Sequence, residues 1–170
     1  DMDNIFCIPL IDDASIENAL NCLAACLYLM TPADQITERM ARLEPIAMRL
    51  EVKEGKNNCV LINDSYNSDL ASLDIALDFL VRRSEKKGFK RTLILSDILE
   101  TGQNTATLYR RVAQLIQSRG INKLIGVGAE ISSCAARFEG TPERYFFPDT
   151  DALLRSGLFK SLHSEVILIK

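Results

Sequence analysis

The fold of this chain is decided at Leu61-Ile62-Asn63-Asp64-Ser65-Tyr66-Asn67-Ser68-Asp69, where a short apolar run ends in a block of polar residues. An apolar pattern at helical spacing follows directly, at Leu70, Leu73, Leu77, Leu80 and Val81. This order predicts a strand, a tight turn and the N-terminus of a helix. In open α/β sheets, ligands bind at the carboxyl ends of strands, and helix N-termini favour anions. Asn, Asp and Ser are also ordinary turn and cap residues, so a purely local role is the alternative interpretation.

The sequence from Leu50 onward repeats this alternation of strand and helix patterns. Strands are predicted at residues 50–53, 60–63, 92–96, 124–127, 144–147 and 166–169, and helices at 70–85, 105–119, 130–138 and 149–156. The alternation predicts an α/β fold, a Rossmann-like and mainly parallel sheet with helices on both faces.

The first 44 residues follow a different pattern. We predict a strand at residues 6–10, a helix at 15–29, and a second helix that begins at Thr31-Pro32 and reaches about Arg42. These elements cannot bury their apolar faces alone, so residues 1–44 are expected to be the end of a larger domain. Pro45 breaks the pattern, and residues 45–170 are expected to form a second domain.

Composition excludes several classes of function. The formal net charge is -3 and no basic patch stands out, which gives nucleic-acid binding little support. No apolar run approaches the length of a membrane span. The five cysteines are scattered. Cys22 and Cys26 are one helical turn apart, but no further ligands converge on them and the only histidine, His163, is far away in sequence. We therefore predict no metal site, free thiols and a cytoplasmic location.

Four segments together resemble the Mur ligases, which build the peptide of bacterial peptidoglycan. The resemblance extends over nearly the whole chain, and the segments occur in the family's order: Ile16-Glu17-Asn18-Ala19-Leu20, Met48-Arg49-Leu50-Glu51, Asn63-Asp64-Ser65-Tyr66-Asn67 and Ser96-Asp97-Ile98-Leu99-Glu100-Thr101-Gly102. Tyr66 points to the branch that joins D-alanyl-D-alanine to UDP-N-acetylmuramoyl-tripeptide.

This resemblance implies an ATP-dependent ligase that works through an acyl phosphate. It identifies residues 1–44 as a remnant of the central ATPase domain and residues 45–170 as the C-terminal domain, truncated before its final helix. The phosphate-binding sequence Gly-x-x-x-x-Gly-Lys-Ser/Thr does not occur in the chain. The implied cofactors are ATP and Mg²⁺, with the Mg²⁺ ligands outside this chain, and the chain alone is expected to be inactive.

The resemblance also assigns roles to residues of the nucleotide site. Asn18 matches the residue that reads adenine, and Arg49 matches the catalytic arginine that reaches the ATP phosphates. Asp64 matches the carboxylate that accepts from the ribose hydroxyls, and Tyr66 and Asn67 are expected to line the nucleotide. The alternatives are an ordinary helix residue, a surface arginine and a turn or cap aspartate.

Ser68, Asp97 and Glu100 are the residues expected to bind the dipeptide substrate, with an ordinary acidic loop as the alternative. Met48 and Tyr109 depart from the family pattern, which suggests a divergent branch. One such branch is a ligase fused to an alanine racemase, although no lysine here has a recognisable racemase context. Other interpretations are another Mur-type or folylpolyglutamate-type amide ligase, or a non-catalytic Rossmann-like module that binds a ligand or partner.

Overall fold

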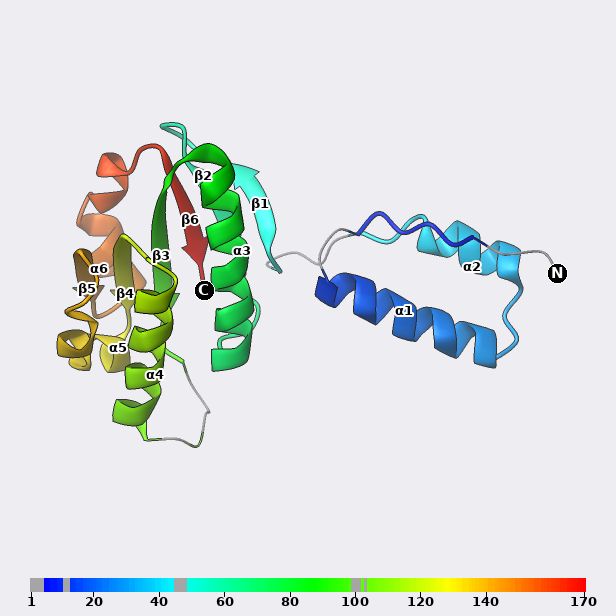
Figure 1. Ribbon diagram of the computed structural model, residues 1–170, viewed down its shortest axis with the longest axis horizontal. Coiled ribbons are helices and arrows are strands. Elements are labelled where there is room, and N and C mark those ends of the chain that lie inside the picture. Colours follow the sequence, from blue (N-terminus) through cyan, green and yellow to red (C-terminus); the bar gives the residue numbers. More distant parts are fainter. Residues whose placement is uncertain (1–4, 11–12, 45–48, 99–101, 103) are drawn as a thin grey trace. The chain divides into compact units, whose positions relative to one another are not determined.

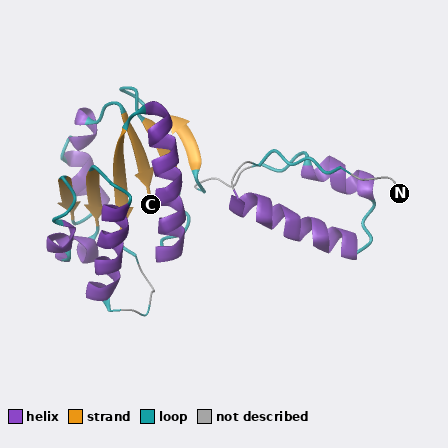
Figure 2. Ribbon diagram, in the orientation of Figure 1, coloured by secondary structure: helices purple, strands orange, loops and turns teal. Residues whose placement is uncertain are grey.

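The chain divides into two compact units in the computed structural model. The structure describes residues 5–10, 13–44, 49–98, 102 and 104–170. The first unit spans residues 1–47 and the second spans residues 48–170. Figures 1 and 2 show the helices and strands of each unit.

The first unit contains two helices, α1 (Asp13–Tyr28) and α2 (Ala33–Met40). Its core is small and comprises Ala19, Ile36 and Met40, with Phe6, Ile8, Leu10, Leu23 and Cys26 packed against it. The second helix begins one residue later than predicted, because Pro32 takes the N-cap position and makes no side-chain cap bond. The assignment of this unit to an ATPase domain stays a prediction.

The strand predicted at residues 6–10 is wrong, since these residues form no regular element. Their apolar side chains do alternate, and Phe6, Ile8 and Leu10 pack against the two helices. A strand also needs a hydrogen-bonded neighbour. None of the described residues of this unit provides one, and Pro9 has no N–H to donate. The alternation therefore reflects packing against helices.

The second unit is built on a six-stranded sheet in the order β1-β2-β6-β3-β4-β5. The strands are β1 (Glu51–Glu54), β2 (Val60–Asn63), β3 (Lys90–Ser96), β4 (Lys123–Val127), β5 (Glu143–Phe147) and β6 (Glu165–Ile169). Only β1 runs antiparallel to its neighbour, and the pairings between the other strands are parallel. The predicted α/β fold with a mainly parallel sheet is confirmed.

Helices cover both faces of this sheet. They are α3 (Leu70–Lys87), α4 (Thr105–Ser118), α5 (Ala129–Ser133) and α6 (Thr150–Arg155), with the 3₁₀ turns η1 (Ala135–Phe138) and η2 (Leu158–Ser161). The single helix predicted at residues 130–138 is wrong, because it is broken at Cys134. The Cys134 N–H is shared between the carbonyls of Glu130 and Ile131, at 3.3 and 3.1 Å, which tightens the helix into the following 3₁₀ turn.

Strand β6 shows how the two faces are formed. Val166 and Leu168 point into the larger core beneath α3, α4 and α5, whereas Ile167 packs on the opposite face with Leu153 of α6 and Leu162. This is the alternation expected of a strand between two layers. In Figure 1, α3 and α4 lie along the same side of the sheet. The result is a three-layer arrangement with β6 near its centre.

A buried ion pair closes the amino-terminal edge of the sheet. Lys123 donates to Glu165 over 2.8 Å, and both side chains are less than a tenth exposed. The other Glu165 oxygen accepts from the Thr92 hydroxyl, and Glu143 lies 3.5 Å from the Lys123 ammonium. Burial lowers the pKa of Lys123, but the hydrogen bond and the charge of Glu165 raise it by a larger amount. The pKa of Lys123 therefore lies above its ordinary value.

Helix α5 starts at a glycine that no other residue can replace without strain. Gly128, its N-cap, has φ 136° and ψ 164°, and the helix receives no cap from its own chain segment. Asp97, just after β3, caps it instead, because its carboxylate accepts from Glu130 N at 3.1 Å and Ile131 N at 2.8 Å. A Cβ on Gly128 would lie 2.3 Å from Asp97 Cγ. The helix therefore depends on the absence of a side chain here.

We expect Gly128→Ala to lower the free energy of unfolding by about 2–4 kcal/mol, from backbone strain plus the disturbed cap. Urea unfolding followed by circular dichroism measures this. The matched control is Gly88→Ala, because Gly88 also has a positive φ of 65° but no described atom would lie within 4 Å of its Cβ. That change should cost only about 1 kcal/mol. Equal losses in the two variants would contradict the importance of the Asp97 contact.

Candidate functional site

The predicted polar turn lies at the carboxyl edge of the sheet, between β2 and α3. The Asn63 side chain accepts from the Ser65 hydroxyl at 2.8 Å, which folds the turn locally. Asp69 caps α3 by accepting from Ser72 N at 2.8 Å in a capping box. That backbone hydrogen bond, opposed by partial burial, holds the pKa of Asp69 below its usual value. The strand, turn and helix N-terminus predicted from the sequence are confirmed.

Asp64 is buried at this edge and faces a lysine. Lys170 Nζ lies 2.6 Å from Asp64 Oδ2, and the lysine side chain is 1% exposed. Strand register brings the two together, because Asn63 pairs with Ile169 and the next residue of each strand therefore lies alongside. Asp64 N also donates to Ile169 O at 2.9 Å. The structure thus adds Lys170 to the residues of this edge.

The second oxygen of Asp64 holds the start of β1. Leu50 N donates to Asp64 Oδ1 at 3.1 Å, and Leu50 has the left-handed φ of 46°. The preceding residue is Arg49, whose guanidinium carbon lies 4.7 Å from the centroid of the Tyr66 ring. This is cation–π distance, and Tyr66 is 55% exposed. Three of the predicted nucleotide-site residues therefore lie at one edge, and Asn67 is exposed beside them.

Asp97 lies on the loop after β3, and Ser68 of the turn between β2 and α3 contacts that loop. Besides capping α5, Asp97 Oδ1 accepts from the Tyr109 hydroxyl at 3.3 Å, and that hydroxyl accepts from Ile98 N at 3.3 Å. Burial, followed by the charge of Asp97, raises the pKa of Tyr109 above its ordinary value. Ser68 Oγ lies 3.5 Å from Asp97 O. The Asp97 carboxylate is thus engaged by three protein donors, which supports an orienting role for it.

Two of the predicted site residues lie outside the described part of the second unit. Asn18 is exposed on α1, in the first unit. Glu100 falls outside the described residues. Their roles, like those of the other predicted site residues, stay predictions.

Lys170 and Leu50 are the residues at this edge that sequence reasoning missed. A lysine directly after a buried apolar strand was the available signal for Lys170. The positive φ of Leu50 could not be predicted from the sequence, because leucine rarely adopts such a conformation.

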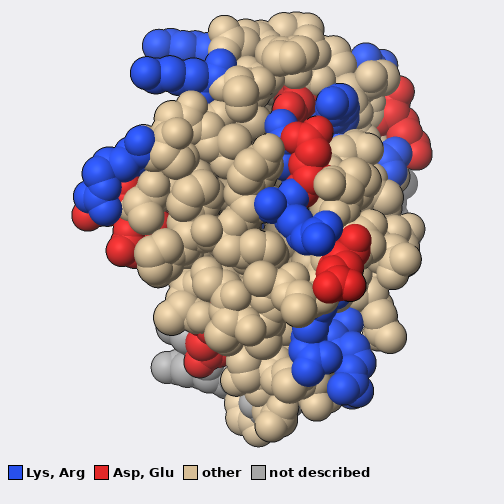
Figure 3. Space-filling model, turned by 90° about the vertical axis from the view of Figure 1, so that its left-hand side faces the viewer, with Lys and Arg blue, Asp and Glu red and all other residues tan. Residues whose placement is uncertain are grey.

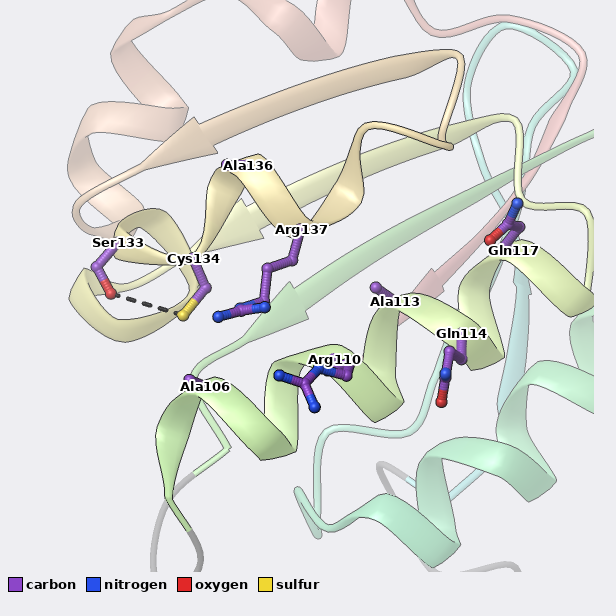
Figure 4. Close-up of a pocket in the computed structure, with 9 residues that line it drawn as sticks. All are labelled: Ala106, Arg110, Ala113, Gln114, Gln117, Ser133, Cys134, Ala136 and Arg137. Carbon is purple, nitrogen blue, oxygen red and sulfur yellow. Dashed lines mark hydrogen bonds between the residues drawn. The ribbon is translucent and has the colours of Figure 1, made fainter.

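A separate groove of about 640 Å³ lies between α4 and the α5–η1 segment (Figure 4). Arg110 of α4 and Arg137 of η1 project into it, together with Gln114 and Cys134. None of the predicted site residues lines this groove. It is therefore distinct from the edge that holds Arg49 and Asp64.

The residues at the sheet edge fit one side of a nucleotide. An ionised carboxylate has about four acceptor positions. Two protein donors occupy two of those on Asp64, so that the remaining positions can accept from hydroxyl groups. The Arg49 guanidinium has five N–H donors that suit phosphate oxygens. No group of three His, Cys, Asp or Glu residues in the described part of the chain could hold a metal ion.

Charged side chains are mixed on the face of the second unit seen in Figure 3, where acidic and basic groups surround a largely uncharged centre.

None of the described helices combines the length and apolar character that a membrane crossing requires.

No family model matches the chain. Among curated proteins, the UDP-N-acetylmuramoyl-tripeptide–D-alanyl-D-alanine ligase of Escherichia coli (strain K12) is 28% identical over 162 residues, which make up 95% of this chain and 34% of that protein. The ligase of the same name from Buchnera aphidicola subsp. Baizongia pistaciae is 26% identical over 165 residues, again 95% of this chain and 34% of that protein. The chain thus spans about a third of the length of these relatives.

A solved structure shows the same fold. The crystal structure of MurF from Acinetobacter baumannii matches 96% of this chain and 36% of that protein, with a TM-score of 0.72 and 20% identity. This chain is therefore similar in sequence to about a third of these ligases, and it shares the fold of the matching part of MurF.

Proposed function

We propose that the chain is the C-terminal part of an ATP-dependent ligase that joins D-alanyl-D-alanine to UDP-N-acetylmuramoyl-tripeptide. The observation that carries the proposal is the gathering of Arg49, Asp64 and Tyr66 at one carboxyl edge, in a chain similar over 95% of its length to ligases of that name. In this reaction, bound ATP supplies the phosphoryl group that activates the tripeptide carboxylate. The dipeptide amine then displaces phosphate.

Arg49 is the residue through which this chain acts on the phosphates. Its guanidinium lies over the Tyr66 ring, 4.7 Å from the ring centroid, and a guanidinium that stacks on a ring keeps its N–H edges available to oxygen acceptors. A fixed cation stabilises charge that develops during transfer more than a mobile one, because it does not have to reorganise. Asp64 contributes acceptor positions for ribose hydroxyls, and Asn67 is exposed next to both.

The dipeptide side of the site involves Ser68 and the loop after β3. The Asp97 carboxylate holds α5 and Tyr109, so its contribution is to fix this loop in place. Ser68 contacts the backbone of the same loop. We place the reaction in the cytoplasm, since five free cysteines suit a reducing compartment.

The first test is the reaction itself. We expect the full-length gene product, given ATP, Mg²⁺ and UDP-N-acetylmuramoyl-tripeptide, to release phosphate only when D-alanyl-D-alanine is present. The 170-residue chain alone should release none, because it lacks the phosphate-binding sequence on which oriented transfer depends. A coupled phosphate assay and mass spectrometry of the product measure both. Dipeptide-independent turnover, or ligation of a different amine, would contradict the proposal.

The second test concerns Arg49. We expect Arg49→Ala in the full-length enzyme to lower kcat about a hundredfold, since one such contact to developing charge contributes on the order of 3 kcal/mol. Arg49→Lys should recover only part of this loss, because lysine keeps the charge but not the fork of donors. Steady-state kinetics with ATP and dipeptide varied separately give these values.

Two control variants accompany this test. Arg82→Ala removes an exposed arginine of α3 that makes no ion pair with the described residues, and it should leave kcat unchanged. Tyr66→Phe keeps the ring beneath Arg49. Tyr66→Ala removes the ring and should lower kcat about two- to fivefold. Wild-type constants for Arg49→Ala would refute the assignment of this edge to the nucleotide.

A further inference from the structure

Lys170 carries a buried charge that the proposed mechanism does not use. Its side chain is 1% exposed, and its ammonium lies 2.6 Å from Asp64 Oδ2. Its backbone is held as firmly, because Lys170 N donates to Ile94 O at 2.9 Å and Lys170 O accepts from Ser96 N at 2.8 Å. The lysine is therefore fixed to β3 by its backbone and reaches past the end of β6 toward the end of β2.

Asp64 passes this constraint on to the start of β1. One carboxylate oxygen is bound by Lys170 and the other by Leu50 N, so that the lysine fixes the direction of the bond to Leu50. Leu50 is held in a left-handed conformation, with φ 46°, and its side chain packs against the main core. This conformation is unfavourable for leucine and persists only where its surroundings impose it.

Arg49 directly precedes this constrained residue. The direction in which its side chain leaves the backbone is set by the conformation of Leu50 and by the Tyr66 ring 4.7 Å away. A change at Lys170 would therefore reach Arg49 through two contacts, Lys170–Asp64 and Asp64–Leu50.

We propose that Lys170 is a positioning residue of the nucleotide site, which orients Asp64 so that Asp64 holds Leu50 and thereby places Arg49. The proposal rests on the proposed function for its catalytic consequence, but its structural part does not. Lys170 is assigned this positioning role and no contact with substrate.

The sheet offers a matched control at the other end of β6. Lys123 is likewise buried and paired with a carboxylate, Glu165, over 2.8 Å. Lys123→Met and Lys170→Met remove equal charge and volume from comparable surroundings. Both should destabilise the fold, and only the second should disturb Leu50.

The structural part is tested by hydrogen exchange of single backbone amides in the 170-residue chain. Lys170→Met should speed exchange at Leu50 by about tenfold, the effect of losing one hydrogen bond, while Lys123→Met leaves it within about twofold. Amides in the middle of α4 report global stability in each variant. Unchanged protection of Leu50 in Lys170→Met would overturn the proposal.

A second pair of variants keeps the test decisive should Lys170→Met fail to fold. Lys170→Met with Asp64→Asn removes both charges but keeps an oxygen that accepts from Leu50 N, whereas Lys170→Met with Asp64→Ala removes the acceptor. We expect about tenfold faster Leu50 exchange in the alanine variant than in the asparagine variant. Equal exchange in the two would show that the side chain at position 64 does not hold Leu50, and would overturn the proposal.

The catalytic part is tested in the full-length enzyme. Lys170→Met should lower kcat/KM for ATP by about tenfold or more. Arg49→Ala should lower kcat/KM for ATP less in the Lys170→Met background than in the wild type, because both changes act on one contact. Lys123→Met should leave kcat/KM for ATP unchanged.

If the enzyme has no ligase activity at all, the proposed function fails and the Leu50 exchange still decides the structural contact. If Leu50 is released but ATP kinetics are unaltered, the positioning role is refuted.

Discussion

Strand β6 holds the sheet of the second unit together, and buried charges bind it at both ends. Glu165 at its start pairs with Lys123 of β4, and Lys170 after its end pairs with Asp64 after β2. Buried ion pairs add little net stability, since desolvation offsets their attraction, but they are costly to break singly. A slip of β6 by one residue would separate both pairs and turn Val166 and Leu168 away from the main core. The two pairs therefore specify the register on which the rest of the sheet depends.

Much of this fold could be predicted from the sequence because burial leaves a periodic record. The strands after Leu50 and the helices α3 and α4 follow from their apolar spacing, and the polar turn after Asn63 marks a strand end and a helix start. Periodicity does not encode hydrogen-bonding partners. Apolar side chains alternate along residues 6–10 although this segment forms no strand. The break at Cys134 arises from a shared hydrogen bond that cannot be predicted from the residue pattern.

The candidate site was predictable in part for the same reason. The resemblance located Arg49, Asp64 and Tyr66, and the structure brings them to one edge. The partners of Asp64 could not be predicted, because they depend on the register between β2 and β6, whose residues lie far apart in sequence. The capping role of Asp97 likewise required knowledge that β3 and β4 are neighbours. Side-chain identity thus suggested the chemistry, and strand order decided which groups meet.

The central place of β6 also affects how the domain is made. It follows the other five strands in the chain, yet it lies between β2 and β3. The pairing of Val60 with Val166 joins residues 106 positions apart, and contacts of such long range slow folding. Until residues 165–169 have left the ribosome, β2 and β3 each present an open hydrogen-bonding edge to other protein chains. During synthesis the nascent domain is therefore most exposed to mispairing and to chaperone capture in the seconds before its sixth strand arrives.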